Sequence, residues 1–128
     1  MLLLDTTVLI DALRGRRAGD RLRRLRATGE VPCVCAINIE EVWRGVRPDE
    51  EGVVASLFRG LRTVPLGSRE GEVAGRWRRT FAERGVTLDQ ADCLIAAAAV
   101  RASAALATGN PSHFPMEEVV VEHWPVGE

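Results

Sequence analysis

The sequence contains no lysine, and all 17 of its basic residues are arginine. This absence excludes several kinds of catalytic site. A Walker A phosphate loop, a Schiff-base amine and the Ser-x-x-Lys hydrolases each depend on a lysine side chain. Any phosphate that this chain binds must therefore be held by arginine, by backbone N–H groups or by a metal ion.

Cysteine is scarce, and long apolar segments are missing. The three cysteines form no ligand-like repeat, which favours small buried side chains in a reducing compartment over a zinc site. No apolar run approaches the roughly 20 residues of a membrane-spanning helix. The opening Met-Leu-Leu-Leu-Asp also lacks the basic segment of a signal peptide. The expectation is a cytoplasmic protein without a membrane partner.

What is present fits one globular domain over residues 1–128. Apolar residues make up 46% of the chain and charged residues 27%, which are ordinary values for a folded protein. The net charge of −1 does not favour general binding to polyanions. A chain of this length can bury a core without disulfides.

Short apolar runs alternate with longer amphipathic segments along the chain. Strands are expected at residues 2–4, 31–35, 63–66, 104–108 and 119–123. Helices are expected at residues 6–13, 18–27, 38–46, 50–60, 68–84 and 88–103. Such alternation predicts an α/β fold with a mostly parallel sheet. In these sheets, sites lie beyond the carboxyl ends of the strands.

Two acidic residues stand near that expected edge. Asp5 closes the first strand, although an aspartate there could equally cap the following helix. Glu41 follows Asn38 by three residues, which is also the spacing of a capping box. Each residue therefore has a structural interpretation beside the functional one.

Asp92 is the most informative acid. A rotation of 100° per residue places it on one helical stripe with Leu88, Ile95 and Ala96, and that stripe should face the sheet. The helix dipole favours an acid in the first turn, but it does not explain a carboxylate on an apolar face. Asp89, one turn earlier, is either an ordinary first-turn acid, which is the favoured interpretation, or a residue that supports Asp92.

Three carboxylates at one sheet edge favour a hard divalent cation. Mg²⁺ and Mn²⁺ prefer oxygen ligands, and the chain has no lysine to neutralise the acids. A cation would keep Asp5, Glu41 and Asp92 ionised despite their mutual repulsion. Such a site can activate water for phosphodiester hydrolysis.

Four ordered segments resemble the motifs of the PIN-domain family, and within it the toxin ribonucleases called virulence-associated protein C (VapC). They are residues 5–11 (DTTVLID), 41–45 (EVWRG), 92–97 (DCLIAA) and 108–114 (TGNPSHF). The resemblance implies a three-layer α/β/α sandwich. It also implies an endoribonuclease that uses Mg²⁺ or Mn²⁺ and acts as the toxin of a type II toxin–antitoxin pair.

The resemblance also implies roles for individual residues and partners. Asp5, Glu41 and Asp92 would be catalytic and metal-binding. The supporting residues would be Thr6, Thr108, Asn110 and His113. The implied partners are an RNA substrate, a cognate antitoxin and a second copy in a homodimer, with DNA reached only through the antitoxin.

The closing segment departs from the family pattern. Asn110 and His113 stand where a fourth acid is common. This leaves the number of metal ions open, and it keeps an alternative function: a PIN-like module that binds RNA or a protein without cleaving. Haloacid-dehalogenase-like phosphatases and receiver domains are disfavoured, because both normally need a lysine.

Arginine is concentrated early in the chain. Residues 14–26 contain seven arginines and one acid. Their guanidinium groups could bind RNA phosphates or an acidic antitoxin segment, and Arg14, Arg16 and Arg17 are the candidates. The alternative is a solvated helix face.

Overall fold

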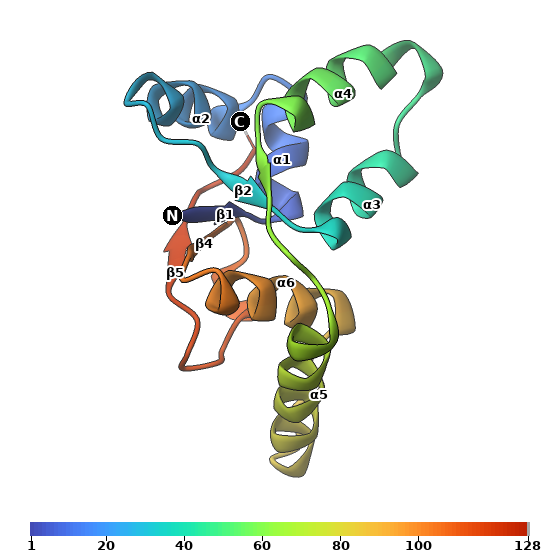
Figure 1. Ribbon diagram of the computed structural model, residues 1–128, viewed down its shortest axis with the longest axis vertical. Helices are drawn as coiled ribbons and strands as arrows, with labels where there is room; N and C mark the ends of the chain where they lie inside the picture. The colour runs from blue at the N-terminus through green and yellow to red at the C-terminus, as the bar shows by residue number, and fades with distance from the viewer. Residues whose placement is uncertain (128) are drawn as a thin grey trace.

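Five parallel strands form the centre of the computed structural model, which describes residues 1–127 (Figure 1). The strands are β1 (Leu2–Leu4), β2 (Cys33–Val34), β3 (Arg62–Thr63), β4 (Ala105–Thr108) and β5 (Val121–His123). Their order is β3-β2-β1-β4-β5, and every neighbouring pair is parallel. The mostly parallel sheet expected from the sequence is thus confirmed, with β1 at its centre.

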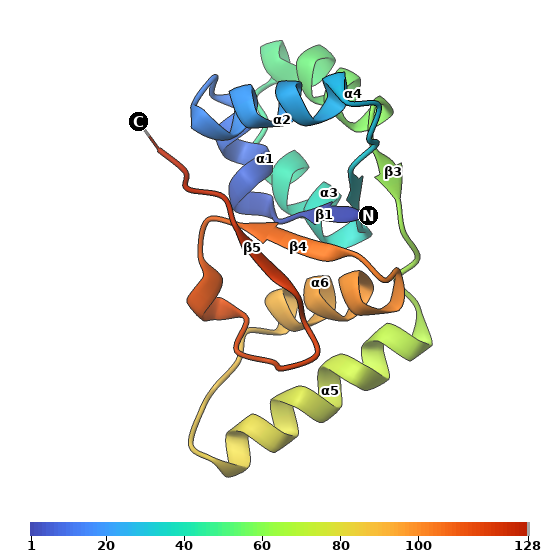
Figure 2. The same ribbon diagram turned by 90° about the vertical axis from the view of Figure 1, so that its left-hand side faces the viewer.

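Helices cover both faces of this sheet (Figures 1 and 2). One face carries α1 (Thr6–Leu13), α2 (Arg17–Ala27), α3 (Ala36–Arg44) and α4 (Glu51–Arg59), with the short 3-10 helix η1 (Pro48–Glu50) before α4. The other carries α5 (Ser68–Glu83) and α6 (Gln90–Arg101). A second 3-10 helix, η2 (Pro111–His113), follows β4. The three-layer sandwich is confirmed.

The alternation of side chains along the strands divides the core in two. Leu3, Cys33 and Leu106 pack against α5 and α6. Leu2 and Leu4 point the other way and pack beneath the first four helices. Because successive strand residues face opposite sides of a sheet, three consecutive leucines serve both cores.

The structure corrects some element bounds. Val31 is 46% exposed, and strand β2 begins only after Pro32, which has no N–H to donate. Helix α3 begins at Ala36, two residues earlier than expected, so Asn38 lies inside it. Helix α6 begins at Gln90 and is capped by Asp89. Short polar side chains can bond several nearby backbone groups, so sequence patterns place helix ends poorly.

The cysteine prediction holds as far as burial goes. All three thiols are free and buried, and burial raises the pKa of Cys33 and of Cys93 to about 11.

Within residues 1–127, no helix is both long enough and apolar enough to span a membrane.

Replacing Asp11 with alanine should lower the free energy of unfolding by about 3 kcal/mol, because two backbone donors would lose a charged acceptor. Asp11 is only 4% exposed. Its carboxylate accepts hydrogen bonds from the Ala18 N–H (2.9 Å) and the Gly127 N–H (2.8 Å). Urea unfolding measures the loss. Exposed Asp20 is the matched control, and an equal loss in Asp20→Ala would contradict this role for Asp11.

Candidate active site

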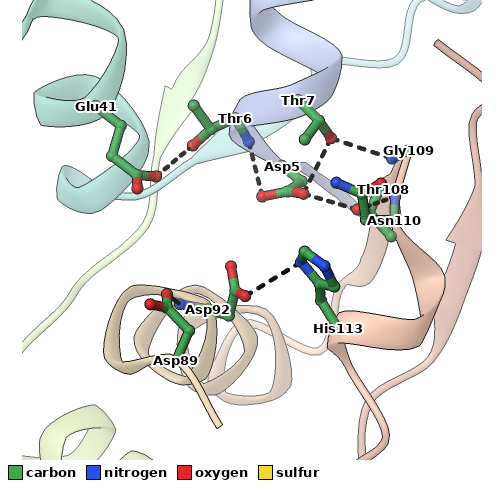
Figure 3. Close-up of polar contacts among 10 residues, drawn as sticks. All are labelled: Asp5, Thr6, Thr7, Glu41, Asp89, Asp92, Thr108, Gly109, Asn110 and His113. Carbon is green, nitrogen blue, oxygen red and sulfur yellow. Dashed lines mark hydrogen bonds and ion pairs between the residues drawn. The ribbon is translucent and has the colours of Figure 1, made fainter.

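Asp5 lies where β1 passes into α1, at the centre of the sheet edge (Figure 3). Its Oδ1 accepts a hydrogen bond from the Thr6 N–H (2.8 Å). Its Oδ2 accepts from the hydroxyls of Thr108 (2.7 Å) and Thr7 (3.1 Å). Both interpretations of Asp5 therefore apply: it caps α1, and its buried carboxylate is fixed by Thr7 at the start of α1 and by Thr108 at the end of β4.

Glu41 is held by α1, not by its own helix. The Thr6 hydroxyl donates to Glu41 Oε1 (2.7 Å) and accepts from Asn38 Nδ2 (3.1 Å). Asn38 Oδ1 accepts from the Cys35 N–H (2.9 Å), and so Asn38 performs the backward capping that the sequence offered as an alternative role for Glu41. That alternative is wrong, and the Glu41 carboxylate is left facing the sheet edge.

Asp92 comes from the opposite side, in the first turn of α6. Its backbone N–H donates to Asp89 Oδ2 (3.0 Å), which makes Asp89 the N-cap and corrects its interpretation as an ordinary first-turn acid. Ile95 and Ala96 on the same stripe are fully buried, as predicted. The Asp92 side chain is 22% exposed, and its Oδ2 lies 3.5 Å from His113 Nδ1.

The charge at this edge is not neutralised by arginine. Within residues 1–127, none of the three carboxylates forms an ion pair with a guanidinium group. Burial raises the pKa of Asp92 to about 6, with further increases from the charges of Asp89, Asp5 and Glu41 and an opposing decrease from His113. The acids thus lie close enough to repel one another.

A divalent cation fits this site by its donor chemistry. Asp5, Glu41 and Asp92 supply hard oxygen donors from three directions around one space (Figure 3). In the present arrangement they are spread out: within residues 1–127, no three acidic, histidine or cysteine side chains are gathered tightly enough to hold an ion. Glu41 would therefore have to leave the Thr6 hydroxyl before the three carboxylates could bind one ion together.

The loop after β4 completes the edge. The Asn110 N–H donates to the Thr108 hydroxyl (3.0 Å), and the Gly109 N–H donates to the Thr7 hydroxyl (3.1 Å). A Cβ at Gly109 would lie 2.8 Å from a methyl carbon of Val126, so a larger residue there would require the Val126 side chain to shift. His113 lies beside the carboxylates, while the backbone of Asn110 braces Thr108.

Sequence reasoning missed two supporting residues, Asn38 and Thr7. Asn38 is fully buried and links α3 to Thr6. The sequence shows Asn38 three residues after the expected strand 31–35, but it gives no sign of the partner, Thr6, which lies 32 positions away. Thr7 is part of the opening motif, and its adjacency to Asp5 was the available signal.

A groove leads away from Glu41 between α1, α3 and α4. It encloses about 570 Å³. Its walls are apolar and polar in about equal parts. The aliphatic residues are Ile10, Leu13, Val42, Val46, Val53 and Val54, and the charged ones are Arg14, Arg47, Glu41, Asp49 and Glu50. Of the predicted arginine contacts, Arg14 lines the groove, whereas Arg16 and Arg17 are exposed at the start of α2 and do not line it.

Comparisons with known proteins agree with this architecture. The family model described as PIN domain matches residues 2–115. Ribonuclease VapC19 of Mycobacterium tuberculosis is 32% identical over 117 residues, which covers 91% of this chain and 94% of that protein. Ribonuclease VapC10 of the same organism is 35% identical over 123 residues, covering 92% and 89%.

Solved structures share the fold. A DNA-bound VapBC from Salmonella typhimurium superposes with a TM-score of 0.84 at 20% identity, covering 96% of this chain and 97% of that one. FitAcB from Neisseria gonorrhoeae superposes with a TM-score of 0.80 at 24% identity, covering 98% of each. With the family model and the two ribonucleases, these likenesses show that the chain belongs to the PIN-domain family, in its VapC branch.

Proposed function

We propose that this protein is a metal-dependent endoribonuclease that acts as the toxin of a type II toxin–antitoxin pair. The observation that carries the proposal is that Asp5, Glu41 and Asp92 face one space at the sheet edge, where, within residues 1–127, no arginine pairs with them. Membership of the VapC branch, whose named relatives are ribonucleases, supports it. The substrate would be RNA.

The three carboxylates would hold Mg²⁺ or Mn²⁺, which would lower the pKa of a bound water and stabilise the oxyanions of phosphodiester hydrolysis. The chain's own residues prepare that site. Thr7 and Thr108 fix the orientation of Asp5, so this ligand is rigid before an ion arrives. Glu41 accepts a hydrogen bond from the Thr6 hydroxyl and would exchange that partner for the ion.

The groove beside Glu41 suits an antitoxin partner. Its aliphatic side chains would bury apolar residues of a bound segment, and its charged side chains of both signs, Arg14 and Asp49 among them, would pair with charges on that segment. Solved neighbours include a toxin–antitoxin complex and two VapBC structures bound to DNA, which supports a cognate antitoxin as the partner of this chain. We propose that this chain reaches DNA only through that antitoxin. From the same relationship we infer that the chain is a single PIN domain and that two copies form a homodimer in the cytoplasm.

The test is cleavage of a mixed RNA pool by purified antitoxin-free protein in Mn²⁺, in Mg²⁺ and in EDTA. We expect cutting only with metal. Glu41→Gln should reduce it at least about hundredfold, because a ligand is lost. Glu40→Gln is the matched control: Glu40 is exposed, pairs with Arg44 and should keep full activity.

Two outcomes would contradict the proposal. RNA binding without cleavage by folded protein in either metal would favour the non-catalytic PIN-like module. Equal activity of Glu41→Gln and wild type would remove Glu41 from the site. The circular dichroism of each variant shows that it is folded.

A further inference from the structure

An imidazole lies within a set of donors that are otherwise all oxygen. His113 Nδ1 is 3.5 Å from Asp92 Oδ2, on the side of the site opposite Glu41 (Figure 3). The position is one at which the sequence lacks the fourth acid that is common in this family. The only other histidine of the chain, His123, lies at the end of β5.

The fold presents this imidazole in a fixed place. His113 ends η2, where its N–H donates to the Asn110 carbonyl (3.0 Å). The next residue, Phe114, is buried, and its N–H donates to the Pro111 carbonyl (3.1 Å). The turn is thus anchored on both sides. The His113 side chain is itself 56% exposed, so a hydrated ion can reach it.

The contact with Asp92 is too long to satisfy either group. At 3.5 Å it lies at the outer limit of a hydrogen bond, well beyond the 2.7–2.9 Å of a charge-assisted one. Within residues 1–127, Asp92 has no other ion-pair partner. A nitrogen and a carboxylate oxygen that face each other at this separation can both turn toward one cation between them.

We infer that His113 is a nitrogen ligand of the divalent-ion site and shifts its preference from Mg²⁺ toward transition ions such as Mn²⁺ and Co²⁺. The inference rests on the proposed metal site. Imidazole is a good ligand for transition ions, whereas Mg²⁺ binds carboxylates and water. Histidine in place of an acid also removes one negative charge, which weakens the binding of an ion held chiefly by charge.

The direct test is pulsed electron paramagnetic resonance of Mn²⁺ bound to the full chain without a histidine tag. A coordinated imidazole gives a ¹⁴N modulation. We expect that signal in wild type and in His123→Ala, the matched control, and its loss in His113→Ala and His113→Asp. Thermal unfolding with each ion gives the preference. The ratio of Co²⁺ affinity to Mg²⁺ affinity should be about tenfold higher in wild type than in His113→Asp.

The outcomes separate this inference from the proposed function. Bound Mn²⁺ without ¹⁴N modulation, or modulation that persists in His113→Ala, overturns the role of His113 even if RNA is cut. Modulation in a protein that cuts no RNA supports the ligand and overturns the nuclease. Failure of the folded wild type to bind Mn²⁺ overturns both.

Discussion

Replacing Asp92 with asparagine should abolish RNA cleavage and at the same time raise the melting temperature of the metal-free protein. The loss of activity should be at least about hundredfold, because a carboxylate ligand becomes a neutral amide. The gain in stability follows from the environment of the carboxylate. Burial and three neighbouring acids raise the pKa of Asp92 to about 6, so its ionised form is unfavourable in the folded state.

The sign of the pH dependence follows from the same shift. The folded state binds the Asp92 proton more tightly than the unfolded state, whose pKa stays near 3.8. Stability from this group is therefore complete below pH about 4 and declines as the pH rises through about 6. With an allowance for partial exposure, the loss of stability at pH 7 is about 2 kcal/mol, which corresponds to a fall in melting temperature of about 7 °C.

Thermal unfolding of wild type and Asp92→Asn in EDTA, between pH 4 and pH 8, measures this effect. The two curves should separate as the pH rises, with the variant more stable at neutral pH. Saturating Mn²⁺ should reverse the order, because only wild type gains fully from the ion. Asp89→Asn keeps a good helix cap and should still cleave RNA. A variant that is less stable than wild type at neutral pH would contradict the assigned cause.

Asp5→Asn should also abolish cleavage, but it should lower stability by about 1–2 kcal/mol. The Thr108 hydroxyl accepts from the Asn110 N–H and donates to Asp5. An amide NH₂ at position 5 would present a donor to that hydroxyl and leave its proton without an acceptor. The amide oxygen can still cap α1, so the variant should remain folded.

Cleavage assays and urea unfolding of Asp5→Asn, beside the exposed control Asp20→Asn, give the two readouts. Retained cleavage by the folded variant would remove Asp5 from the site. A rise in stability like that expected for Asp92→Asn would show that repulsion, not hydrogen bonding, dominates at Asp5. If Asp5→Asn is less stable and Asp92→Asn more stable than wild type, and both lose cleavage, then the loss of activity is not caused by a loss of folded protein.

Local patterns were sufficient to predict the layers and the edge on which the acids lie. Strand β1 is three leucines followed by Asp5, and both its span and its terminal acid match the prediction. Helical periodicity placed Asp92 correctly above Ile95 and Ala96. These features depend on residues within a few positions of one another, which is the range over which sequence periodicity is informative.

Contacts between distant segments could not be predicted in the same way. Glu41 was assigned a possible capping role because Asn38 precedes it by three residues. In the structure, Asn38 does the capping, and Glu41 binds the hydroxyl of Thr6, which is 35 positions away. The proximity of His113 to Asp92 likewise depends on how η2 packs beside α6. Only tertiary packing determines these pairs.

The central place of β1 has a consequence for how the chain folds. The partners of Leu2, Leu3 and Leu4 on one side are Ala105, Leu106 and Ala107, so the middle of the sheet joins segments far apart along the chain. Closing so large a loop is entropically costly and slows folding. The hydrogen bond from Thr108 to Asp5 forms with that same pairing. We therefore expect the Asp5 carboxylate to become rigid only late in folding, at the step that completes the sheet.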